Sequence, residues 1–426
     1  MTSSLQWLLL QLSRKLWFRA SLFSVLAVAT ALVAILLQPF IPADISAKVG
    51  ADAVDAILGI IAASMLAVTI FSLSTMVSQY TAASSNVTPR AIRLLIEDTA
   101  AYNALGAFIG AFLFSLVGII ALSTGMYGSQ GRLVLMVVTL LVIVFVVVML
   151  LRWIDHASTM GQVAETTQCI EKAVAKAMRA RHELPYLGGT PLLDPTHDIP
   201  ADAQPVFAQQ IGYVQHVDMQ ALSDLAGAQP GGAVFVTSPP GAFVEPSRPL
   251  AWARGLPRDH VEDKLRTAFT IHSLRSFEQD PRFGATVLSE IASRALSPGI
   301  NDPGTAIDVI GRAVRVLAIW TEQRTADDGV AHPGVHVPGI DLADLFDDLF
   351  RPIARDGAGM VEVGIRLQKA LRSLATFGDA RFRDCAQRHS QLALQRALAA
   401  LTIEQDKQVL RGLAAEIAAI GKPAQP

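Results

Sequence analysis

Long uncharged stretches dominate the first third of the chain. Residues 133–151 contain nineteen residues without a charge and with a single polar side chain, Thr139, between Arg132 and Arg152. As a helix rising about 1.5 Å per residue, this segment is roughly 28 Å long, close to the ~30 Å hydrocarbon core of a bilayer. Nine of its residues are Val or Ile, but a strand of this length is implausible. The pattern therefore predicts a membrane-spanning helix.

Three further uncharged stretches precede this one. They lie between Arg19 and Asp44, from Ala56 to Thr88, and from Thr99 to Gly131. Each is long enough for one membrane-spanning helix with an overhang into the headgroup region. We therefore predict a transmembrane domain over residues 1–152, with four spans near 20–41, 56–79, 101–123 and 132–152.

The basic residues of the short loops predict the orientation of the spans. Lys and Arg are frequent before the first span, in the second loop and after the fourth span, whereas the first and third loops carry only Lys48 and Arg132. Because cytoplasmic loops carry the excess of Lys and Arg, both termini are expected in the cytoplasm. The region after residue 152 is then a large cytoplasmic domain, and the lipid bilayer is the first partner of this protein.

The second predicted span carries several polar side chains on one broad arc, at 100° per residue. One interpretation is a water-lined path for an ion or solute, and the other is hydrogen bonding between helices, which we favour because Ser and Thr commonly join membrane helices. No ionisable side chain lies in the middle of any predicted span, which disfavours proton-coupled transport. The arc consists of Ser64, Ser72, Thr75, Ser78 and Gln79.

The third predicted span contains a GxxxG motif, Gly106 to Gly110. Small residues at this spacing let a second helix approach closely. Packing within one subunit and dimerisation explain the motif equally well. Since four spans rarely enclose a pore, a channel function requires a homo-oligomer.

The sequence of the second loop predicts a short amphipathic helix at the membrane surface. Thr88 is suited to cap its first turn, and Pro89 to occupy the first helical position. Arg90 and Arg93 are then candidates for binding lipid headgroups. The alternative, which we weigh equally, is that the two arginines only set the topology.

Composition and charge exclude some classes of partner. The chain is 51% hydrophobic, its formal net charge is −2, and no basic patch is visible, so nucleic-acid binding is not expected. The two cysteines, Cys169 and Cys385, are far apart and form no CxxC motif. They fit a reducing compartment better than a disulfide framework.

The remaining chain divides by composition into three parts. Residues 153–210 are expected to form a helix followed by a Pro-rich connector. Residues 211–257 form a small strand–helix–strand unit, with Asp218 as a helix cap. Residues 258–426 are mainly helical. The fold class is thus a multi-pass α-helical membrane protein with four transmembrane helices and a C-terminal cytoplasmic α/β region, mostly helical with a small strand-containing unit.

Apolar residues near position 345 recur at the spacing of a helix. Leu342, Leu345, Phe346, Leu349 and Phe350 lie at i, i+3, i+4, i+7 and i+8, which predicts a buried helical face. The intervening aspartates are interpreted as a solvated surface and not as a metal cluster.

Residues 275–306 contain two Asp-Pro pairs, each suited to start a helix. Asp280 and Asp302 can accept from free backbone N–H groups, and Pro281 and Pro303 fit the first helical position. We expect the polar residues of this stretch to converge between the two helix starts. They either bind an anion or, as we favour, form a buried structural knot of arginines and carboxylates. The set is Arg275, Glu278, Asp280, Arg294, Asn301, Asp302 and Thr305.

These same residues carry a family resemblance. The run RALSPGINDP at 294–303, the preceding FEQD at 277–280 and the Thr88-Pro89-Arg90 triplet resemble the domain-of-unknown-function family 2254 of predicted bacterial membrane proteins. The resemblance covers nearly the whole chain. It implies a multi-pass protein of the bacterial inner membrane and implies no activity.

Catalytic signatures are absent from the sequence. We find no Walker A loop, GxSxG elbow, HExxH or Rossmann glycine run, so we predict no enzyme, catalytic residue or cofactor. His332 and His336 lie in a Gly/Pro-containing segment read as a loop without an acidic or cysteine partner, so no metal is predicted either.

Three functions remain as hypotheses. The first is an oligomeric channel or transport-like assembly with a cytoplasmic gating or assembly domain. The alternative is a membrane-anchored ligand-binding or regulatory module without transport. The third is a membrane-bound enzyme, which would need His272, Glu278 and Asp280 to meet in one pocket. The ligand or transported solute is unknown in each case.

Overall fold

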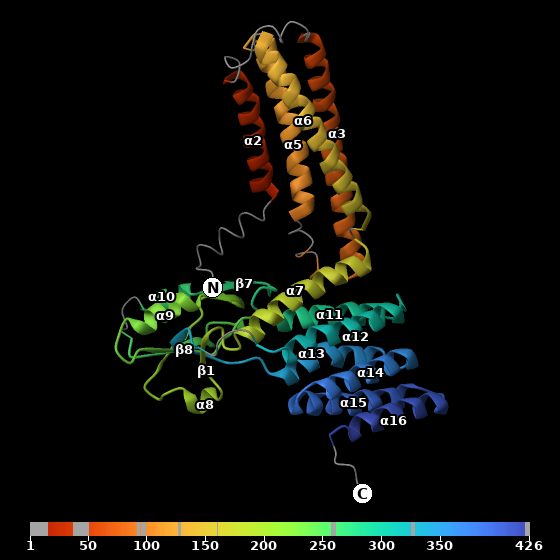
Figure 1. The fold of residues 1–426 in the computed structure, drawn as a ribbon. Coiled ribbons are helices and arrows are strands. Elements are labelled where there is room, and N and C mark those ends of the chain that lie inside the picture. The colour runs from red at the N-terminus through yellow and green to blue at the C-terminus, as the bar shows by residue number, and fades with distance from the viewer. Residues whose placement is uncertain are drawn as a thin grey trace. The chain divides into compact units, whose positions relative to one another are not determined.

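The computed structural model describes residues 16–36, 51–91, 94, 99–126, 129–159, 161–256, 261–324 and 329–421. The chain divides into two compact units (Figure 1). The N-terminal unit extends to Thr166, and the C-terminal unit runs onward from Thr167. The division falls in the first turns of α7 (Val163–Glu183), so this helix is the first element of the C-terminal unit.

The N-terminal unit consists, among the described residues, of long apolar helices. These are α2 (Leu16–Leu36), α3 (Ala51–Asn86), α5 (Thr99–Ser123) and α6 (Ser129–Thr159). In the described chain three segments are long and apolar enough to cross a membrane, namely Ala53–Ser85, Ala100–Ser123 and Gly131–Thr159. They match the second, third and fourth predicted spans. The first predicted span begins in α2, but its last residues lie outside the described part of the chain, and it stays a prediction.

The GxxxG motif packs two helices of the same chain together. A Cβ atom at Gly106 would lie 2.7 Å from Cδ2 of Phe23, and one at Gly110 would lie 3.2 Å from the Phe23 carbonyl oxygen. Both glycines therefore let α5 approach α2 closely. Of the two interpretations of the motif, packing within one subunit is the one that these contacts support. On the outside of the unit, large apolar side chains such as Phe71 and Leu141 are exposed, as suits a surface in contact with hydrocarbon.

The C-terminal unit contains two small sheets. The larger has the strand order β1-β8-β4-β6-β2, and the smaller has the order β5-β3-β7. The larger sheet consists of β1 (Gly189–Pro191), β2 (Gln204–Phe207), β4 (Ala233–Val236), β6 (Pro249–Arg254) and β8 (His332–Val337). The smaller consists of β3 (Gly212–Val217), β5 (Phe243–Val244) and β7 (Phe269–His272).

Three of these strands lie where the sequence predicts irregular structure. The Pro-rich segment 184–210 contains β1, β2 and the short helix α8 (Pro195–Asp198). The histidine-containing segment expected to be a loop is β8, which pairs in parallel with β1 and β4. Proline and glycine argue locally against a strand, but Val335 and Val337 are fully buried in the sheet core. Burial and pairing on both sides therefore override the local propensity.

Both sheets share one hydrophobic core with α9 (Met219–Gly227). Its buried members include Val214, Leu222, Val234 and Leu250. Asp218 caps α9 by accepting a hydrogen bond of 3.0 Å from the backbone N–H of Ala221, as predicted. The helix α10 (Val261–Thr267) lies between β6 and β7 in the chain.

The rest of the C-terminal unit is a stack of helices, seen in Figure 1 from α11 to α16. The predicted apolar face of α13 is buried as expected. The predicted helical character of residues 258–426 continues after α13 in three further helices, α14 to α16. The stack consists of α11 (Pro281–Ala295), α12 (Pro303–Ala318), α13 (Leu342–Asp356), α14 (Val361–Phe377), α15 (Ala380–Ala400) and α16 (Glu404–Ala419).

Candidate functional site

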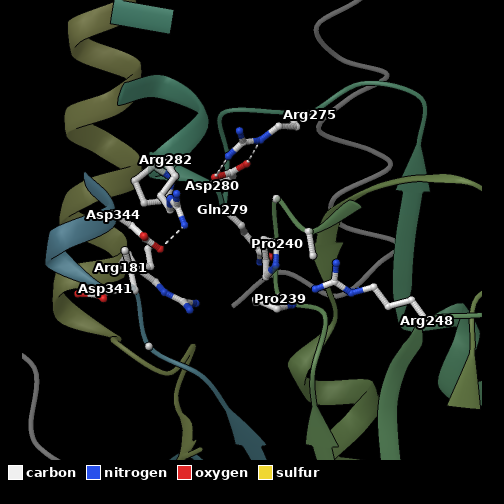
Figure 2. A pocket seen from close by; sticks show the side chains of 15 residues that line it. Arg181, Pro239, Pro240, Arg248, Arg275, Gln279, Asp280, Arg282, Asp341 and Asp344 are labelled. Atoms are coloured by element: carbon white, nitrogen blue, oxygen red, sulfur yellow. Dashed lines mark hydrogen bonds and ion pairs between the residues drawn. The ribbon is translucent and has the colours of Figure 1, made fainter. Parts of the chain in front are cut away.

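A pocket of about 340 Å³ lies between the sheet part and the helix stack of the C-terminal unit (Figure 2). Five segments form its walls: the end of α7, the loop between β4 and β5, the turn between β5 and β6, the segment that leads into α11 with the first turn of that helix, and the segment leading into α13. The lining residues are Arg181, Pro239, Pro240, Gly241, Ala242, Arg248, Arg275, Gln279, Asp280, Pro281, Arg282, Gly339, Ile340, Asp341 and Asp344. Four arginines and three aspartates thus face one small space.

Asp280 combines two roles at the start of α11. Its Oδ1 accepts a 3.0 Å hydrogen bond from the backbone N–H of Phe283, which caps the helix. The Arg275 guanidinium donates to both carboxylate oxygens, from Nε to Oδ2 at 2.7 Å and from Nη2 to Oδ1 at 2.9 Å (Figure 2). Burial raises the pKa of Asp280 above its ordinary value, although the hydrogen bonds and charge of Arg275 oppose this shift.

The loop between β4 and β5 approaches this carboxylate at Gly241. This residue has φ of +92°, and a Cβ atom there would collide with Oδ2 of Asp280. Only glycine satisfies both the left-handed backbone and the lack of space. The Gly241 N–H donates to the Val214 carbonyl oxygen at 2.8 Å. The loop wall is therefore held in place on both sides.

The opposite wall depends on how α7 is held against the helix stack. Glu171 of α7 accepts from Arg312 at 2.7 Å and from Arg315 at 2.6 and 2.9 Å. Although burial alone would raise the pKa of Glu171, these two arginines lower it overall. Val174 of α7 packs directly on Gly284 of α11, where any Cβ atom would collide with it. These contacts fix the axis of α7, and with it the position of Arg181 near the end of that helix.

Arg181 is the least satisfied charge of the pocket. Its side chain is only 4% exposed, and Nη2 donates to the Pro338 carbonyl oxygen at 2.9 Å. Its Nε and Nη1 have no hydrogen-bond partner in the described part of the protein. Burial lowers the pKa of Arg181 to about 10, against the opposing effects of Asp280 and Tyr186. At neutral pH the guanidinium remains charged, so its burial opposes folding.

The other two arginines of the pocket have different surroundings. Arg282 donates to Asp344 and, from Nε at 2.7 Å, to Asp348, so its charge is balanced within the helix stack. Arg248 is exposed and donates to the Phe243 carbonyl oxygen at 3.2 Å. Figure 2 shows the guanidinium groups of Arg181 and Arg248 entering the pocket from opposite sides.

The charges of the pocket can therefore be divided into paired and unpaired groups. Arg275 pairs with Asp280, and Arg282 pairs with Asp344. Within the described chain, Arg181 and Arg248 form no ion pair with a carboxylate, while Asp341 caps α13 by accepting from the Ala343 N–H at 2.9 Å. A buried cation that lines a pocket and forms no ion pair there is suited to an anion.

The structure brings only part of the predicted polar set together. Arg275 and Asp280 line the pocket, whereas Glu278 is exposed and is absent from the lining. Arg294 lies at the other end of α11, a helix about 20 Å long. The predicted convergence of all seven residues is wrong, because a short connection places the start of α12 beside the end of α11 and not beside its start.

The remaining members of the set lie around the start of α12. Asp302 caps this helix by accepting from the Thr305 N–H at 3.0 Å, and its other oxygen accepts from Thr305 Oγ1 at 2.6 Å. Asn301 precedes it with φ of +52°. The predicted capping roles of Asp280 and Asp302 are therefore confirmed. For the enzyme hypothesis, Asp280 lines the pocket, but His272 and Glu278 do not.

Sequence reasoning missed the residues that distinguish this pocket. In the sequence, Arg181 is only one of several basic residues after the fourth predicted span, and Pro239-Pro240-Gly241 indicates only a turn. The aspartates of α13 were read as solvated surface, yet Asp344 and Asp348 pair with Arg282. Single arginines and turns carry no local signal, because only the fold brings them to one place.

The polar arc of α3 is divided by the packing of the N-terminal unit. Ser72 is buried, and Gln79 donates from Nε2 to the Ala157 carbonyl oxygen of α6 at 2.7 Å. Thr75 is half-buried and bonds back to the Phe71 carbonyl oxygen of its own helix. Ser64 and Ser78 are exposed on the outside of the unit. The five residues therefore do not line one common path within a single chain.

The predicted lipid-headgroup residues are only partly described. Arg90 is exposed at the turn that follows α3. Arg93 and most of the predicted amphipathic helix lie outside the described residues. Binding of these arginines to headgroups stays a prediction.

Comparisons with known proteins agree with the membrane character of the chain. A family model described as "Predicted membrane protein (DUF2254)" matches residues 13–373. Uncharacterised proteins of Mycobacterium bovis and Mycobacterium tuberculosis are 27% identical over 274 residues, which cover 61% of this chain and 50% of theirs. The chain thus spans about half the length of the curated relatives it matches. No solved structure matches.

Proposed function

The chain belongs to the domain-of-unknown-function family 2254 of predicted membrane proteins, and from this premise we propose that it is a membrane-anchored module that binds an anionic ligand in its C-terminal unit. The observation that supports this proposal is the environment of Arg181. Its guanidinium is buried and charged, and two of its nitrogens have no partner among the described residues. Because these two nitrogens are closed to solvent, the ligand would act chiefly by placing a negative charge beside the guanidinium from the pocket that Arg181 lines.

The buried charge of Arg181 has an energetic cost. A charge removed from water and left unpaired destabilises a fold by several kcal/mol, whereas a hydrophobic residue of similar size does not. Such a group persists where a ligand completes its interactions. Arg275 and Arg282 already have carboxylate partners, so Arg181 and Arg248 are the groups available to an incoming anion.

The test is anion binding to the full-length protein in detergent. We expect inorganic phosphate to raise the melting temperature of the wild type at constant ionic strength and to leave Arg181→Met unshifted. Arg248→Ala changes an exposed side chain and should weaken binding without affecting the fold. Arg254→Ala is the matched control, since Arg254 ends strand β6, which Arg248 directly precedes, and pairs with Asp202 outside the pocket. A wild type unaffected by phosphate and sulfate, or an equal shift in Arg181→Met, would contradict the proposal.

For the membrane region we propose four spans in the bacterial inner membrane, with both termini in the cytoplasm. The apolar helix α2 supports a fourth span, because an even number of spans returns the chain to its starting side. The distribution of Lys and Arg in the loops supports the orientation. Reporter fusions after residues 50 and 126 should report the periplasm, and fusions after residues 94 and 421 the cytoplasm. A C-terminal reporter in the periplasm would contradict this topology.

An oligomeric channel or transport-like assembly is the second candidate function. The observation that favours it is the exposure of Ser64 and Ser78 on the outer side of α3, where a neighbouring copy would provide hydrogen-bond partners. A ring of subunits would place these hydroxyls near its axis, with the C-terminal unit as the gating or assembly domain. The mass of the protein in detergent, corrected for bound detergent, tests this candidate. A monomer would exclude a shared pore.

A further inference from the structure

We propose that the ligand of the arginine pocket is a phosphate monoester of a small hydroxylated molecule. This inference rests on the proposed anion-binding function and specifies its ligand. It follows from the size of the pocket, from its two arginines that form no ion pair within the described chain, and from the acceptors beside them.

The pocket is larger than a simple oxyanion needs. Its volume is about 340 Å³. Pockets for small organic ligands begin at about 300 Å³. A bare phosphate or sulfate ion would fill only a minor part of this space, so the ligand is expected to have a body attached to its anionic group.

The charge of the anionic group follows from the two arginines without carboxylate partners. Arg181 and Arg248 enter from opposite walls (Figure 2), and neither forms an ion pair in the described part of the chain. A phosphate monoester carries about −1.5 to −2 charges at pH 7 and presents three acceptor oxygens. It therefore matches two guanidinium groups better than a single carboxylate does.

The loop that faces Arg181 cannot replace the arginines as a donor. Pro239 and Pro240 have no backbone N–H. The N–H of Gly241 donates to Val214, and that of Ala242 donates to Pro239 at 3.0 Å. Unlike a glycine-rich phosphate loop, this wall offers no free amides to the ligand. Recognition of the phosphate is therefore expected to depend on the arginine side chains.

The body of the ligand meets acceptors as well as apolar surface. Asp341 uses Oδ1 for the α13 cap, and a carboxylate has further lone pairs for other donors. Asp344 lines the same side of the pocket, and Ile340 adds apolar surface. Carboxylates repel a second anionic group but accept hydrogen bonds from hydroxyl groups. A polyol-like body fits this arrangement.

The experiment compares four probes by calorimetry on the full-length protein in detergent: glycerol 3-phosphate, inorganic phosphate, glycerol and serine. We expect glycerol 3-phosphate to bind at least tenfold more tightly than inorganic phosphate, and glycerol and serine not to bind. Arg181→Met should abolish binding of both phosphates. Arg254→Ala should bind all four probes as the wild type does.

A second variant tests the contacts of the hydroxylated part of the ligand separately from those of its phosphate group. Asp341→Asn keeps a residue able to cap α13 but removes one negative charge. It should reduce the preference for glycerol 3-phosphate over inorganic phosphate at least threefold, because the repulsion of the bare ion falls and a hydroxyl acceptor weakens. An unchanged preference would overturn the assignment of the hydroxyl contacts.

The outcomes distinguish this inference from the proposed function. Equal affinity for phosphate and its ester, both lost in Arg181→Met, would overturn the monoester and leave the anion site intact. Tight binding of serine would assign the pocket to an amino acid instead and would also overturn it. Absence of binding by every anion would overturn both proposals. Competition by dioctanoyl phosphatidic acid would identify a lipid headgroup as the source, and competition by glycerol 3-phosphate alone would identify a soluble metabolite.

Discussion

The starts of α11 and α12 share a motif and differ in their surroundings. Each helix begins with Asp-Pro, and in each the aspartate accepts a 3.0 Å hydrogen bond from the backbone N–H three residues later. Asp280, however, is buried in the pocket and held by Arg275, whereas Asp302 is exposed and bonded within its own helix start, to Thr305 and Gly304. One start is part of a candidate binding site, and the other ends a surface loop.

The difference shows in the direction of the two carboxyl pKa values. The pKa of Asp280 is raised, because burial outweighs the effect of Arg275. The pKa of Asp302 is lowered, because the Thr305 hydroxyl and backbone N–H stabilise its charged form. The same cap thus has opposite electrostatic consequences, which the environment determines and the motif does not.

Replacing Asp280 should have the largest effect. Asp280→Ala removes the cap and leaves the Arg275 charge without its partner, so we expect α11 to lose about 3–5 kcal/mol of stability. Hydrogen exchange of the α11 amides in the full-length protein measures this loss. Asp280→Asn is the matched control, because Asn still caps a helix and only the charge is removed. A loss near 1 kcal/mol would mean that the ion pair adds little beyond the cap.

Gly241→Ala should have the next largest effect. Of the two helix starts, it should affect only that of α11, which lies at the pocket. The substitution forces a left-handed backbone on a residue with a Cβ atom and pushes that atom onto the Asp280 carboxylate. We expect a loss of about 2–3 kcal/mol and a weaker response to phosphate. Gly231→Ala is the control, since Gly231 also has positive φ but has open space around it. Equal effects of the two variants would show that backbone strain alone matters.

Asp302→Ala should have a smaller effect. It removes an exposed cap and its bond to Thr305, which is worth about 1 kcal/mol. Hydrogen exchange of the first α12 amides should increase, while α11 and the response to phosphate remain unchanged. A change in ligand response would indicate that the start of α12 communicates with the pocket, contrary to the separation described here.

A change of pH should also distinguish the two carboxylates, with the smallest free-energy differences of these experiments. The stabilisation from Asp302 is fully present above its unfolded pKa of about 3.8. It is lost as the pH falls through the lower folded pKa. Asp280 behaves in the opposite way, since its charged form is disfavoured in the fold and acidification from neutral pH relieves that cost first. Hydrogen exchange of α12 between pH 2.5 and 7 should show the difference between wild type and Asp302→Ala vanish at the acid end. A constant difference would contradict the lowered pKa.

Much of the helical architecture could be predicted from local sequence pattern. Three spans, the buried face of α13 and the caps at Asp218, Asp280 and Asp302 all depend on residues a few positions apart. The strand β8 could not be predicted this way, because its Pro and Gly disfavour a strand and its stability comes from two neighbouring strands and from burial.

The sequence by itself determined that this chain enters a membrane, where its helices begin and which aspartates cap them, because these properties depend on hydropathy and on contacts within one turn. Only the tertiary structure decided which charges share a space. Arg181, Gly241 and Asp280 come from three separate segments, and their meeting in one pocket depends on the packing of α7 against α11 and α12 and on the β4–β5 loop. Burial then gives residues of the same type different electrostatic free energies. How deeply each residue is buried depends on the fold as a whole.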